Sequence, residues 1–374
     1  RELELDKDII LTTYALLRID IEKFNKQEWE LVIIDEAQNI KNPDTAQSIA
    51  VKSLKSKGHI AMTGTPMENR LTELWSIFDF INKGYLGSIS SFQKKYAIPI
   101  ERNNEEDKIE NLKKATSPFI LRRLKTDRSI IKDLPEKLVM DEYCYLTKEQ
   151  AALYEKVLQE SIKSIQNATG ISRSGNIFKL ITSLKQICNH PAHYTKTDKL
   201  TRELSGKTDK ALSIVENVLE QNEKVLIFTQ YKEMGDLLVK IIQNELEEDS
   251  LFFHGTLPRK RRDEIIEEFQ NNEQSKIMIV SLKAGGTGLN LTAAANVIHY
   301  DLWWNPAVED QATDRTYRIG QTKNVMVHRL VTIGTFEEKI DEMIKSKKQL
   351  ADMALYTGEK MLSEMSNQEL MEIF

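Results

Sequence analysis

The chain has 374 residues and a formal net charge of −5, with 40% hydrophobic residues, 29% charged residues and two cysteines. This balance predicts a globular cytoplasmic protein of about two domains, without a disulfide framework or a basic nucleic-acid coat. No apolar stretch reaches the length of a membrane span, and the first residues do not resemble a signal peptide, so no membrane partner is expected.

Residues 8–66 alternate apolar strands with polar helical stretches, which predicts a parallel α/β sheet. One strand, residues 31–34, runs directly into Asp35 and Glu36. Ligands of open α/β sheets bind at the carboxyl ends of the strands. There, Asp35 can hold Mg²⁺ while Glu36 orients and activates a water. A strand that ends in two acids is also a common entry into a loop, so this pair alone decides nothing.

Between residues 70 and 128 the apolar residues recur with the period of a helix, and no segment has the pattern of a strand. We place a domain boundary after residue 133. Domain one therefore covers residues 1–133 and domain two covers residues 134–374. A second helical block is expected over residues 147–205, with a flexible loop at 168–176. Its segment from Cys188 to His193 offers too few metal ligands, at poor spacing, for a metal site.

Strand–helix alternation resumes in domain two, and its strands are predicted at residues 224–228, 250–253, 276–280, 296–300 and 324–331. An amphipathic helix should follow over about residues 335–352, where it would brace one domain against the other. The run Arg259–Arg262 is a candidate contact for nucleic acid, but the acids that follow it could equally pair with it on a solvated face.

A glycine loop follows the predicted strand at 276–280, in the sequence Val280-Ser-Leu-Lys-Ala-Gly-Gly-Thr-Gly-Leu-Asn290. Glycines let backbone N–H groups approach phosphate closely, and Lys283 adds a positive charge. The spacing of these glycines is not that of a Rossmann dinucleotide site, which excludes a nicotinamide oxidoreductase.

Three polar side chains, Gln311, Arg315 and Arg318, follow at positions i, i+4 and i+7. On a helix this spacing predicts an amide and two guanidiniums along one face. Guanidinium stays charged and binds phosphate oxygens in a fork, so such a face suits a nucleotide transition state. A solvated helix face would explain the same spacing.

Four motifs in this order resemble the Swi/Snf family, the ATP-driven double-stranded-DNA translocases of helicase superfamily two. They are DEAQ (35–38), TGTP (63–66), AGGTGLNL (284–291) and QATDRTYRIGQ (311–321). The resemblance covers almost the whole chain and is closest to compact bacterial and archaeal members. It implies two RecA-like parallel-sheet lobes with helical insertions, and it makes the segment from Cys188 to His193 a helix end in such an insertion. The chain opens just before what resembles the third strand of the first lobe, which would make that lobe incomplete at its N-terminus.

The resemblance implies ATP and Mg²⁺ as cofactors, contacted by both lobes when they close. Catalytic roles fall to Glu36, to Arg318 as the arginine that reaches the γ-phosphate, and to Arg315 and Gln311. Nucleotide would be bound by Asp35, Gln38, Gly286, Gly288 and Asn290.

Double-stranded DNA is the implied partner, held by its backbone without sequence preference, and DNA-bound proteins would be displaced or remodelled. The residues placed on the duplex by the resemblance are Thr12, Thr13, Thr63, Thr65, Gln230, Ser281, Lys283 and Trp303. For Trp303 and Trp304, core packing is the competing interpretation, because they end an apolar strand. A cytoplasmic, nucleoid-associated protein is expected.

One family motif, the phosphate-binding sequence G-x-x-x-x-G-K-[ST], does not occur in these 374 residues. We therefore expect residues 1–374 alone to bind ATP poorly and not to hydrolyse it. Two alternatives stay open: an RNA or single-strand helicase of the same superfamily, and a non-catalytic DNA-binding scaffold that has kept the fold.

Overall fold

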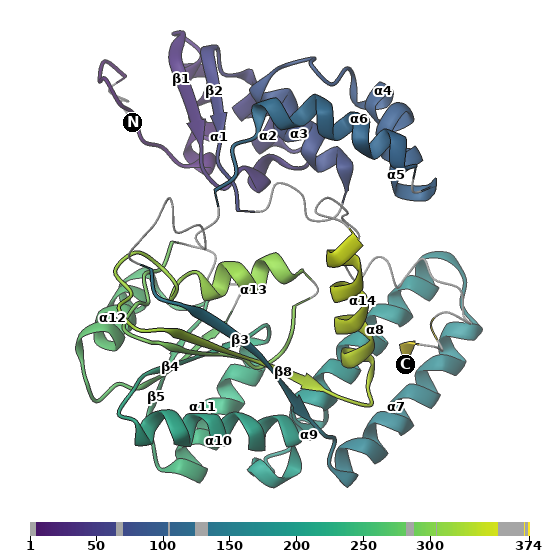
Figure 1. The fold of residues 1–374 in the computed structure, drawn as a ribbon, viewed down its shortest axis with the longest axis vertical. Helices are drawn as coiled ribbons and strands as arrows, with labels where there is room; N and C mark the ends of the chain where they lie inside the picture. The colour runs from purple at the N-terminus through teal and green to yellow at the C-terminus, as the bar shows by residue number, and fades with distance from the viewer. Residues whose placement is uncertain are drawn as a thin grey trace. The chain divides into compact units, whose positions relative to one another are not determined.

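The structure is a computed structural model that describes residues 5–64, 70–103, 105–123, 134–281, 288–303, 305–350, 370, 373 and 374. It consists of two compact units, which divide between residues 123 and 124 (Figure 1). The predicted boundary after residue 133 lies at the far end of a segment, 124–133, outside the described residues. Both units combine helices with parallel strands, so the predicted α/β class is confirmed.

Unit 1 is built on a two-stranded parallel sheet of β1 (Trp29–Ile34) and β2 (Ser56–Ala61). The connection between them contains η1 (Ala37–Ile40) and α2 (Ala46–Ser53), and α1 (Tyr14–Phe24) precedes β1. One face of the sheet packs on these helices. On the other face, Leu31 and Ile33 are 47% and 53% exposed.

The apolar segment at residues 8–13 does not form a strand, although the alternation predicted one there. A strand needs a neighbour to accept and donate its backbone hydrogen bonds. Among the described residues, β1 pairs only with β2, and Leu11 is 93% exposed. Thr13 instead caps α1, and its Oγ1 accepts a hydrogen bond from the N–H of Leu16 at 3.2 Å.

The remainder of unit 1 is helical. The range predicted as its helical insertion, 70–128, contains no strand among its described residues. Its core is a separate apolar cluster in which Trp75, Phe78, Phe92 and Leu112 are buried. The elements are α3 (Leu71–Ile81), α4 (Ile89–Phe92), η2 (Gln93–Ala97), α5 (Ile98–Asn103), α6 (Glu106–Thr116) and η3 (Ser117–Phe119).

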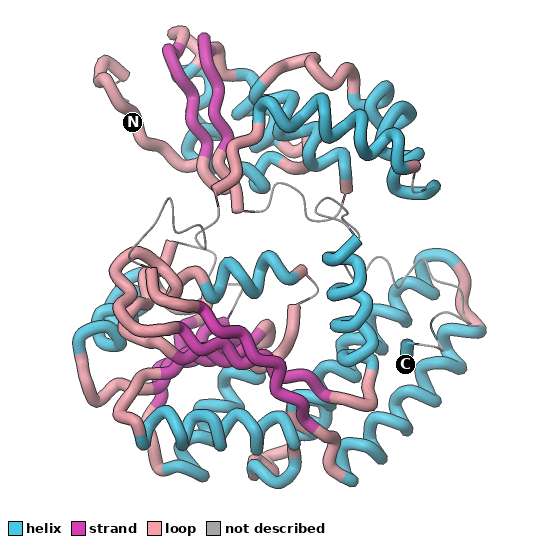
Figure 2. The backbone as a smooth tube through the Cα atoms, in the orientation of Figure 1, coloured by secondary structure: helices cyan, strands magenta, loops and turns pink. Residues whose placement is uncertain are grey.

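Unit 2 contains a six-stranded parallel sheet in the order β3-β8-β7-β4-β6-β5. Its strands are drawn in magenta in Figure 2. Five of its strands occupy the predicted apolar runs to within a residue. Their bounds are β4 (Val225–Thr229), β5 (Ser250–Phe253), β6 (Ile277–Ser281), β7 (Asn296–His299) and β8 (Val325–Thr332); β3 (Lys137–Cys144) adds the edge next to β8.

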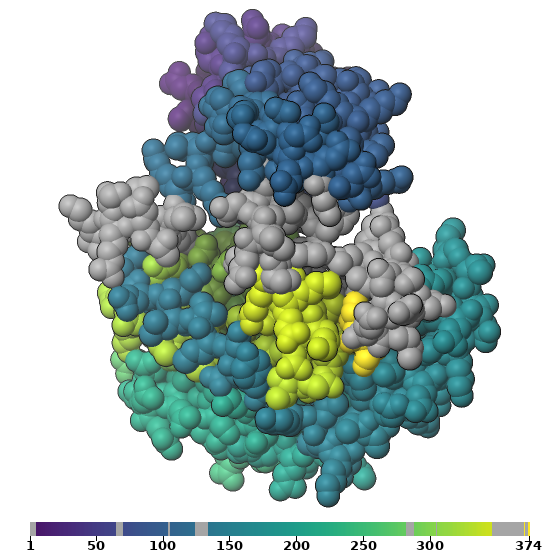
Figure 3. All heavy atoms as spheres, turned by 45° about the vertical axis from the view of Figure 1, so that its right-hand side comes forward, coloured from purple at the N-terminus to yellow at the C-terminus, as the bar shows by residue number. Residues whose placement is uncertain are grey.

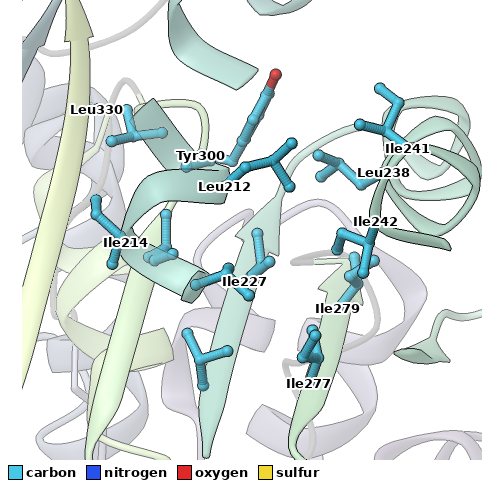
Figure 4. Packing of buried hydrophobic residues seen from close by; sticks show 14 of the residues in the cluster. Leu212, Ile214, Ile227, Leu238, Ile241, Ile242, Ile277, Ile279, Tyr300 and Leu330 are labelled. Atoms are coloured by element: carbon cyan, nitrogen blue, oxygen red, sulfur yellow. The ribbon is translucent and has the colours of Figure 1, made fainter. Parts of the chain in front are cut away.

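Both faces of the sheet are covered over β4, β6 and β7, which is why these strands are continuous apolar runs. One face packs on α10 (Gly206–Glu220) and α11 (Lys232–Leu246), where Ile227 and Ile279 meet the helices (Figure 4). The other face packs on α12 (Arg259–Asn271) and α13 (Pro306–Thr313), with Phe228 at its centre. Complete burial of one such side chain stabilises the unit by about 1.5–3 kcal/mol.

A long helical hairpin follows β3 and occupies the range predicted as the second helical insertion. It consists of α7 (Lys148–Gln166), α8 (Gly170–Asn189), α9 (Pro191–Thr195) and η4 (Arg202–Leu204). The flexible loop predicted at 168–176 is wrong, because α8 begins at Gly170. Its glycine and serine content is overridden by Ile177 and the apolar residues after it, which are buried against α7. The helix end predicted at Cys188 is confirmed.

The last long helix, α14 (Phe336–Leu350), covers the predicted range 335–352 closely. Its apolar side, Phe336, Ile340 and Ile344, packs on the α7–α8 hairpin of its own unit. Figure 3 shows its outer side at the surface, beside the C-terminal residues, and the Phe336 ring lies 5.9 Å from the ring of Phe374. Whether it braces one lobe on the other stays a prediction. None of the described helices has both the length and the apolar character of a membrane span.

Candidate functional site

In unit 1 the predicted acid pair lies at the carboxyl end of β1, in a turn with unusual backbone geometry. Glu36 has a left-handed backbone, with φ of 51°. Its N–H donates to Asp35 Oδ1 at 2.9 Å, and the hydroxyl of Tyr14 donates to the carbonyl of Asp35 at 2.7 Å. A non-glycine residue in this region costs free energy, and such residues cluster at functional sites.

Gln38 joins this acid turn to the end of β2. Its Nε2 donates to Glu36 Oε2 at 2.7 Å, while its Oε1 accepts from the hydroxyl of Thr63, also at 2.7 Å. The carboxylate of Glu36 is therefore held in one direction by an amide that is itself fixed by the neighbouring strand. The predicted residues Glu36, Gln38 and Thr63 thus lie together. Thr65 lies outside the described residues.

The environment of the turn keeps Tyr14 protonated. Burial, followed by the negative charges of Asp35 and Glu36, raises the pKa of Tyr14 to about 12. The phenol therefore remains a donor to the backbone of the turn at every working pH. Nearby, Thr12 is exposed, whereas the hydroxyl of Thr13 is already used as the cap of α1.

The acid turn can take a divalent cation of the kind that needs few protein ligands. The carboxylate of Asp35 is exposed at the strand end. Among the described residues there is no group of three or more His, Cys, Asp or Glu side chains that could hold a metal by themselves. Mg²⁺ fits such a place, because one or two carboxylates plus phosphate oxygens and water complete its shell.

In unit 2 the predicted glycine loop is only partly described. Ser281 ends β6 and is buried, and the structure resumes at Gly288, which has φ of 35°. Lys283 and Gly286 lie outside the described residues. The side chain of Asn290 is exposed, and its carbonyl accepts from Gln270 Nε2 at 3.0 Å.

The prediction that Gln311, Arg315 and Arg318 share one helix face is wrong, because α13 ends at Thr313. Only Gln311 is helical. Arg315 is buried in the following turn, and its carbonyl accepts from the N–H of Leu291 at 2.9 Å. Arg318 is exposed, and its Nη1 lies 3.4 Å from the carbonyl of Leu289.

Backbone turns replace the helix after Thr313. The N–H groups of Arg315 and Thr316 donate to the carbonyls three residues earlier, at 3.1 and 2.9 Å, and Thr316 and Tyr317 are buried. Gln321 Nε2 then bonds the carbonyls of Thr292 and Ala294, at 3.1 and 2.9 Å. Arg318 therefore lies beside Leu289, at the described end of the glycine loop. The predicted phosphate-binding arginine and the predicted phosphate-binding loop are close together.

Gln230 and Trp303 also lie close together, at the ends of β4 and β7. Gln230 Nε2 donates to the carbonyl of Leu302 at 2.6 Å, and the N–H of Trp303 donates to Glu309 Oε1 at 2.7 Å. The indole of Trp303 is half-buried against the sheet core, so the packing interpretation accounts for part of its surface. Trp304 lies outside the described residues.

Sequence reasoning missed a set of buried ions next to these residues. Asp301 is fully buried and accepts from Thr229 Oγ1 at 2.5 Å and from the N–H of Gln230 at 2.8 Å. Lys207 is buried against Glu337, with both Nζ–O distances 2.8 Å. One signal was available: Asp301 directly follows an apolar strand, as Asp35 does.

The segment Ser205-Gly206-Lys207-Thr208 contains the last three residues of a phosphate-binding motif, but here they serve packing. A Cβ on Gly206 would lie 2.0 Å from the carbonyl oxygen of Tyr145. Thr208 Oγ1 lies 2.7 Å from the hydroxyl of Tyr300. Burial opposes the charge of Lys207, yet Glu337 holds its pKa above the ordinary value.

Two family profiles match the chain. The SNF2-related domain matches residues 1–193, and the helicase conserved C-terminal domain matches residues 207–320. The first match continues past unit 1 and ends within α9, so its limit differs from the division between the two units.

The relatives are longer proteins. The putative ATP-dependent helicase/translocase YwqA of Bacillus subtilis is 49% identical over 370 residues, which are 98% of this chain and 40% of that protein. The DNA repair and recombination protein RAD26 of Saccharomyces cerevisiae is 36% identical over 90% of this chain and 32% of its own length. The chain therefore spans less than half the length of these relatives.

Two solved structures from Sulfolobus solfataricus are similar. The SWI2/SNF2 ATPase core in complex with dsDNA is 46% identical, with a TM-score of 0.59, over 100% of this chain and 78% of that one. The separately solved C-terminal domain of a SWI2/SNF2 ATPase is 39% identical, with a TM-score of 0.56. That match covers 64% of this chain and 98% of the domain.

Proposed function

Because this chain belongs to the SWI2/SNF2 family of ATPases, we propose that it is the motor part of an ATP-dependent double-stranded-DNA translocase. The observation that carries the proposal is the hydrogen-bonded chain from Glu36 through Gln38 to Thr63. It fixes a carboxylate at the end of a strand, where α/β sheets bind ligands, and ties it to the neighbouring turn.

Unit 1 would supply the group that activates water. Glu36 accepts a hydrogen bond from Gln38, which keeps one carboxylate oxygen directed. The carboxylate would orient the attacking water and accept its proton. Asp35 would hold Mg²⁺ with the help of phosphate oxygens, and the bound cation would neutralise charge on the triphosphate of ATP.

Unit 2 would supply positive charge and backbone donors. Arg318 is exposed beside Leu289, so its guanidinium is placed where Gly288 and Asn290 end the glycine loop. We assign it the contact with the γ-phosphate, which is worth about 10³–10⁵ in rate in other phosphoryl-transfer enzymes. Arg315, Gln311 and Gly286 are proposed as supporting nucleotide contacts. Each unit supplies only part of the chemistry, so loss of either set should stop turnover.

The duplex would be held by its phosphates. The proposed contacts are Thr12, Thr13, Thr63, Gln230, Ser281 and Trp303 of the described residues, with Thr65 and Lys283. Hydroxyl, amide and ammonium groups bind phosphate oxygens without reading bases, so binding should be independent of sequence and should weaken with salt. Such a motor would act on DNA-bound proteins in the cytoplasm, at the nucleoid.

The test is an ATPase assay of the intact protein that carries this chain, with duplex DNA, with single-stranded DNA and without DNA. Duplex DNA should stimulate turnover more than single strands do. Stronger stimulation by single-stranded DNA or by RNA would favour the helicase alternative. Absence of turnover under all conditions would favour the non-catalytic scaffold.

Residues 1–374 by themselves should bind ATP weakly and should not hydrolyse it, because their sequence contains no G-x-x-x-x-G-K-[ST] motif. The nearest sequence, at Gly206, Lys207 and Thr208, is committed to buried contacts. Titration calorimetry of this segment with Mg·ATP should show little heat. Micromolar affinity would mean that the described residues bind the triphosphate without that motif.

A further inference from the structure

The peptide between Leu302 and Trp303 is held from both sides by buried polar groups. Its carbonyl accepts from Lys185 Nζ at 3.0 Å and from Gln230 Nε2 at 2.6 Å. Its N–H donates to Glu309 Oε1 at 2.7 Å. Lys185 is 5% exposed and Glu309 is 6% exposed, so water competes little for these bonds.

Glu309 uses its second oxygen differently. Glu309 Oε2 accepts from Arg329 Nε at 3.0 Å. Arg329 also donates to Asp341 of α14 at 2.8 Å and to Asp141 of β3 at 2.5 Å. The position of the Glu309 carboxylate is therefore set by an arginine that two further carboxylates fix in place.

Glu309 precedes the proposed nucleotide-binding residues in the chain. It lies in the first turn of α13, where the helix dipole favours an acid. Two residues later comes Gln311, and the turn that contains Arg315 follows directly after the helix. Any movement of the start of α13 must carry the acceptor of the Trp303 N–H with it.

We propose that Glu309 is a positioning residue that links the segment from Gln311 to Arg318 with Trp303. One oxygen accepts from the Trp303 N–H and the other is held by Arg329, so the carboxylate fixes the Trp303 peptide at a set position relative to the start of α13. The inference rests on the proposed function, in which Trp303 contacts the duplex and Arg318 contacts nucleotide. Glu309 itself touches neither ligand.

The chain offers a matched set of variants for the test. Glu309→Ala removes the acceptor for Trp303 and the bond to Arg329. Glu309→Gln keeps an acceptor for Trp303 and loses the ion pair. Asp341→Asn also weakens the contacts of Arg329 but has no bond to Trp303. The intact protein is assayed for ATP turnover over a range of duplex concentrations.

Glu309→Ala should raise the duplex concentration that gives half-maximal stimulation by about tenfold, the effect of losing one charge-assisted hydrogen bond. In Glu309→Gln and Asp341→Asn this duplex concentration should stay within about twofold of that of the unmodified protein. Both variants keep an acceptor for the Trp303 N–H, and loss of that whole bond is what corresponds to about tenfold. A purely structural loss would lower the maximal rate in all three and leave that concentration unchanged. Equal half-saturation in Glu309→Ala and Asp341→Asn would therefore overturn the proposal. If Glu309→Ala does not fold, Glu309→Asp replaces it, because the shorter side chain cannot reach both partners.

A second measurement separates this inference from the proposed function. Amide hydrogen exchange at Trp303 should accelerate at least about tenfold in Glu309→Ala and hardly change in Asp341→Asn. Lack of duplex stimulation in the unmodified protein would remove the translocase proposal alone. Unchanged exchange at Trp303 in Glu309→Ala would remove the contact on which the positioning role depends.

Discussion

The two units use their sheets and their charges in opposite ways. In unit 1 one face of β1 and β2 is open, with Leu31 and Ile33 about half exposed, and the acids of the site lie at the surface. In unit 2 both sheet faces are covered, and acids such as Glu337 are buried. The difference separates two roles: exposed acids at a strand end can meet a ligand, whereas buried acids hold helices on a sheet.

The largest effect on stability or activity is expected when one buried acid of unit 2 and one acid of the site in unit 1 are each replaced by glutamine. Glu337→Gln leaves Lys207 buried without its carboxylate and should lower the free energy of unfolding of unit 2 by about 3–5 kcal/mol. Glu36→Gln should change stability by less than about 0.5 kcal/mol and should stop ATP turnover. Urea unfolding of the intact protein measures the stability of both variants, and ATPase assays measure their turnover. A large loss of stability in Glu36→Gln would show that Glu36, like Glu337, stabilises the fold.

Replacement of Arg318 tests whether an exposed charged residue of unit 2 also acts on turnover and not on stability. Arg318→Ala should slow ATP hydrolysis at least about a hundredfold, because it removes charge that stabilises the transition state. Unfolding should hardly change, since Arg318 is exposed and the hydrogen bond of its guanidinium to the carbonyl of Leu289 is long. Arg315→Ala is the control within the same turn. A mild effect at Arg318 and a severe one at Arg315 would reverse the two assignments.

Buried histidines should make unit 2 more sensitive to acid than unit 1. Burial, and then the charges of Arg329 and Lys137, lower the pKa of His299 to about 3; burial lowers that of His193 to about 4. Unit 1 has only the half-buried His59. Because the folded state disfavours the proton, this stability is present above the ordinary pKa of 6.5 and is lost as pH falls below it.

For His299 the loss between pH 7 and pH 5 is about 2 kcal/mol. His299→Gln should therefore reduce the difference in unfolding free energy between these two pH values by about that amount. Urea unfolding of unit 2 at both pH values measures it. An unchanged pH dependence would show that His299 is not kept neutral by its burial.

The smallest effect concerns single methylene groups in the two sheets. Ile227→Val removes one from a fully covered strand and should cost about 0.5–1.5 kcal/mol. Ile33→Val removes one from the open face of β1 and should cost less than about 0.5 kcal/mol. Equal costs would mean that the open face of unit 1 is covered in the intact protein.

The sequence predicted those parts of the fold that depend on local pattern. Five strands of unit 2, β4 to β8, were predicted to within a residue, because their apolar runs are buried in the sheet core. The edge strand β3, in which Leu138 and Val139 are 44% and 53% exposed, was not predicted. The two-lobe RecA-like architecture, inferred from four motifs, agrees with the likeness to the SWI2/SNF2 ATPase core.

The errors arose where tertiary contacts override spacing. Residues 8–13 have a strand pattern but no neighbouring strand among the described residues, and Gly170 begins a helix because the residues after it are buried. The spacing of Arg315 and Arg318 suggested one helix face, yet α13 ends at Thr313 and the chain continues in backbone turns. Side-chain spacing alone does not show where a helix ends.

The close approach of Gly206 to the carbonyl of Tyr145 has a consequence for evolution. With a Cβ only 2.0 Å from that oxygen, every other residue type is sterically excluded at this position. Lys207 and Thr208 are similarly committed to partners inside the unit. We expect this tripeptide to vary little over time, and its invariance would then report on steric fit and buried contacts.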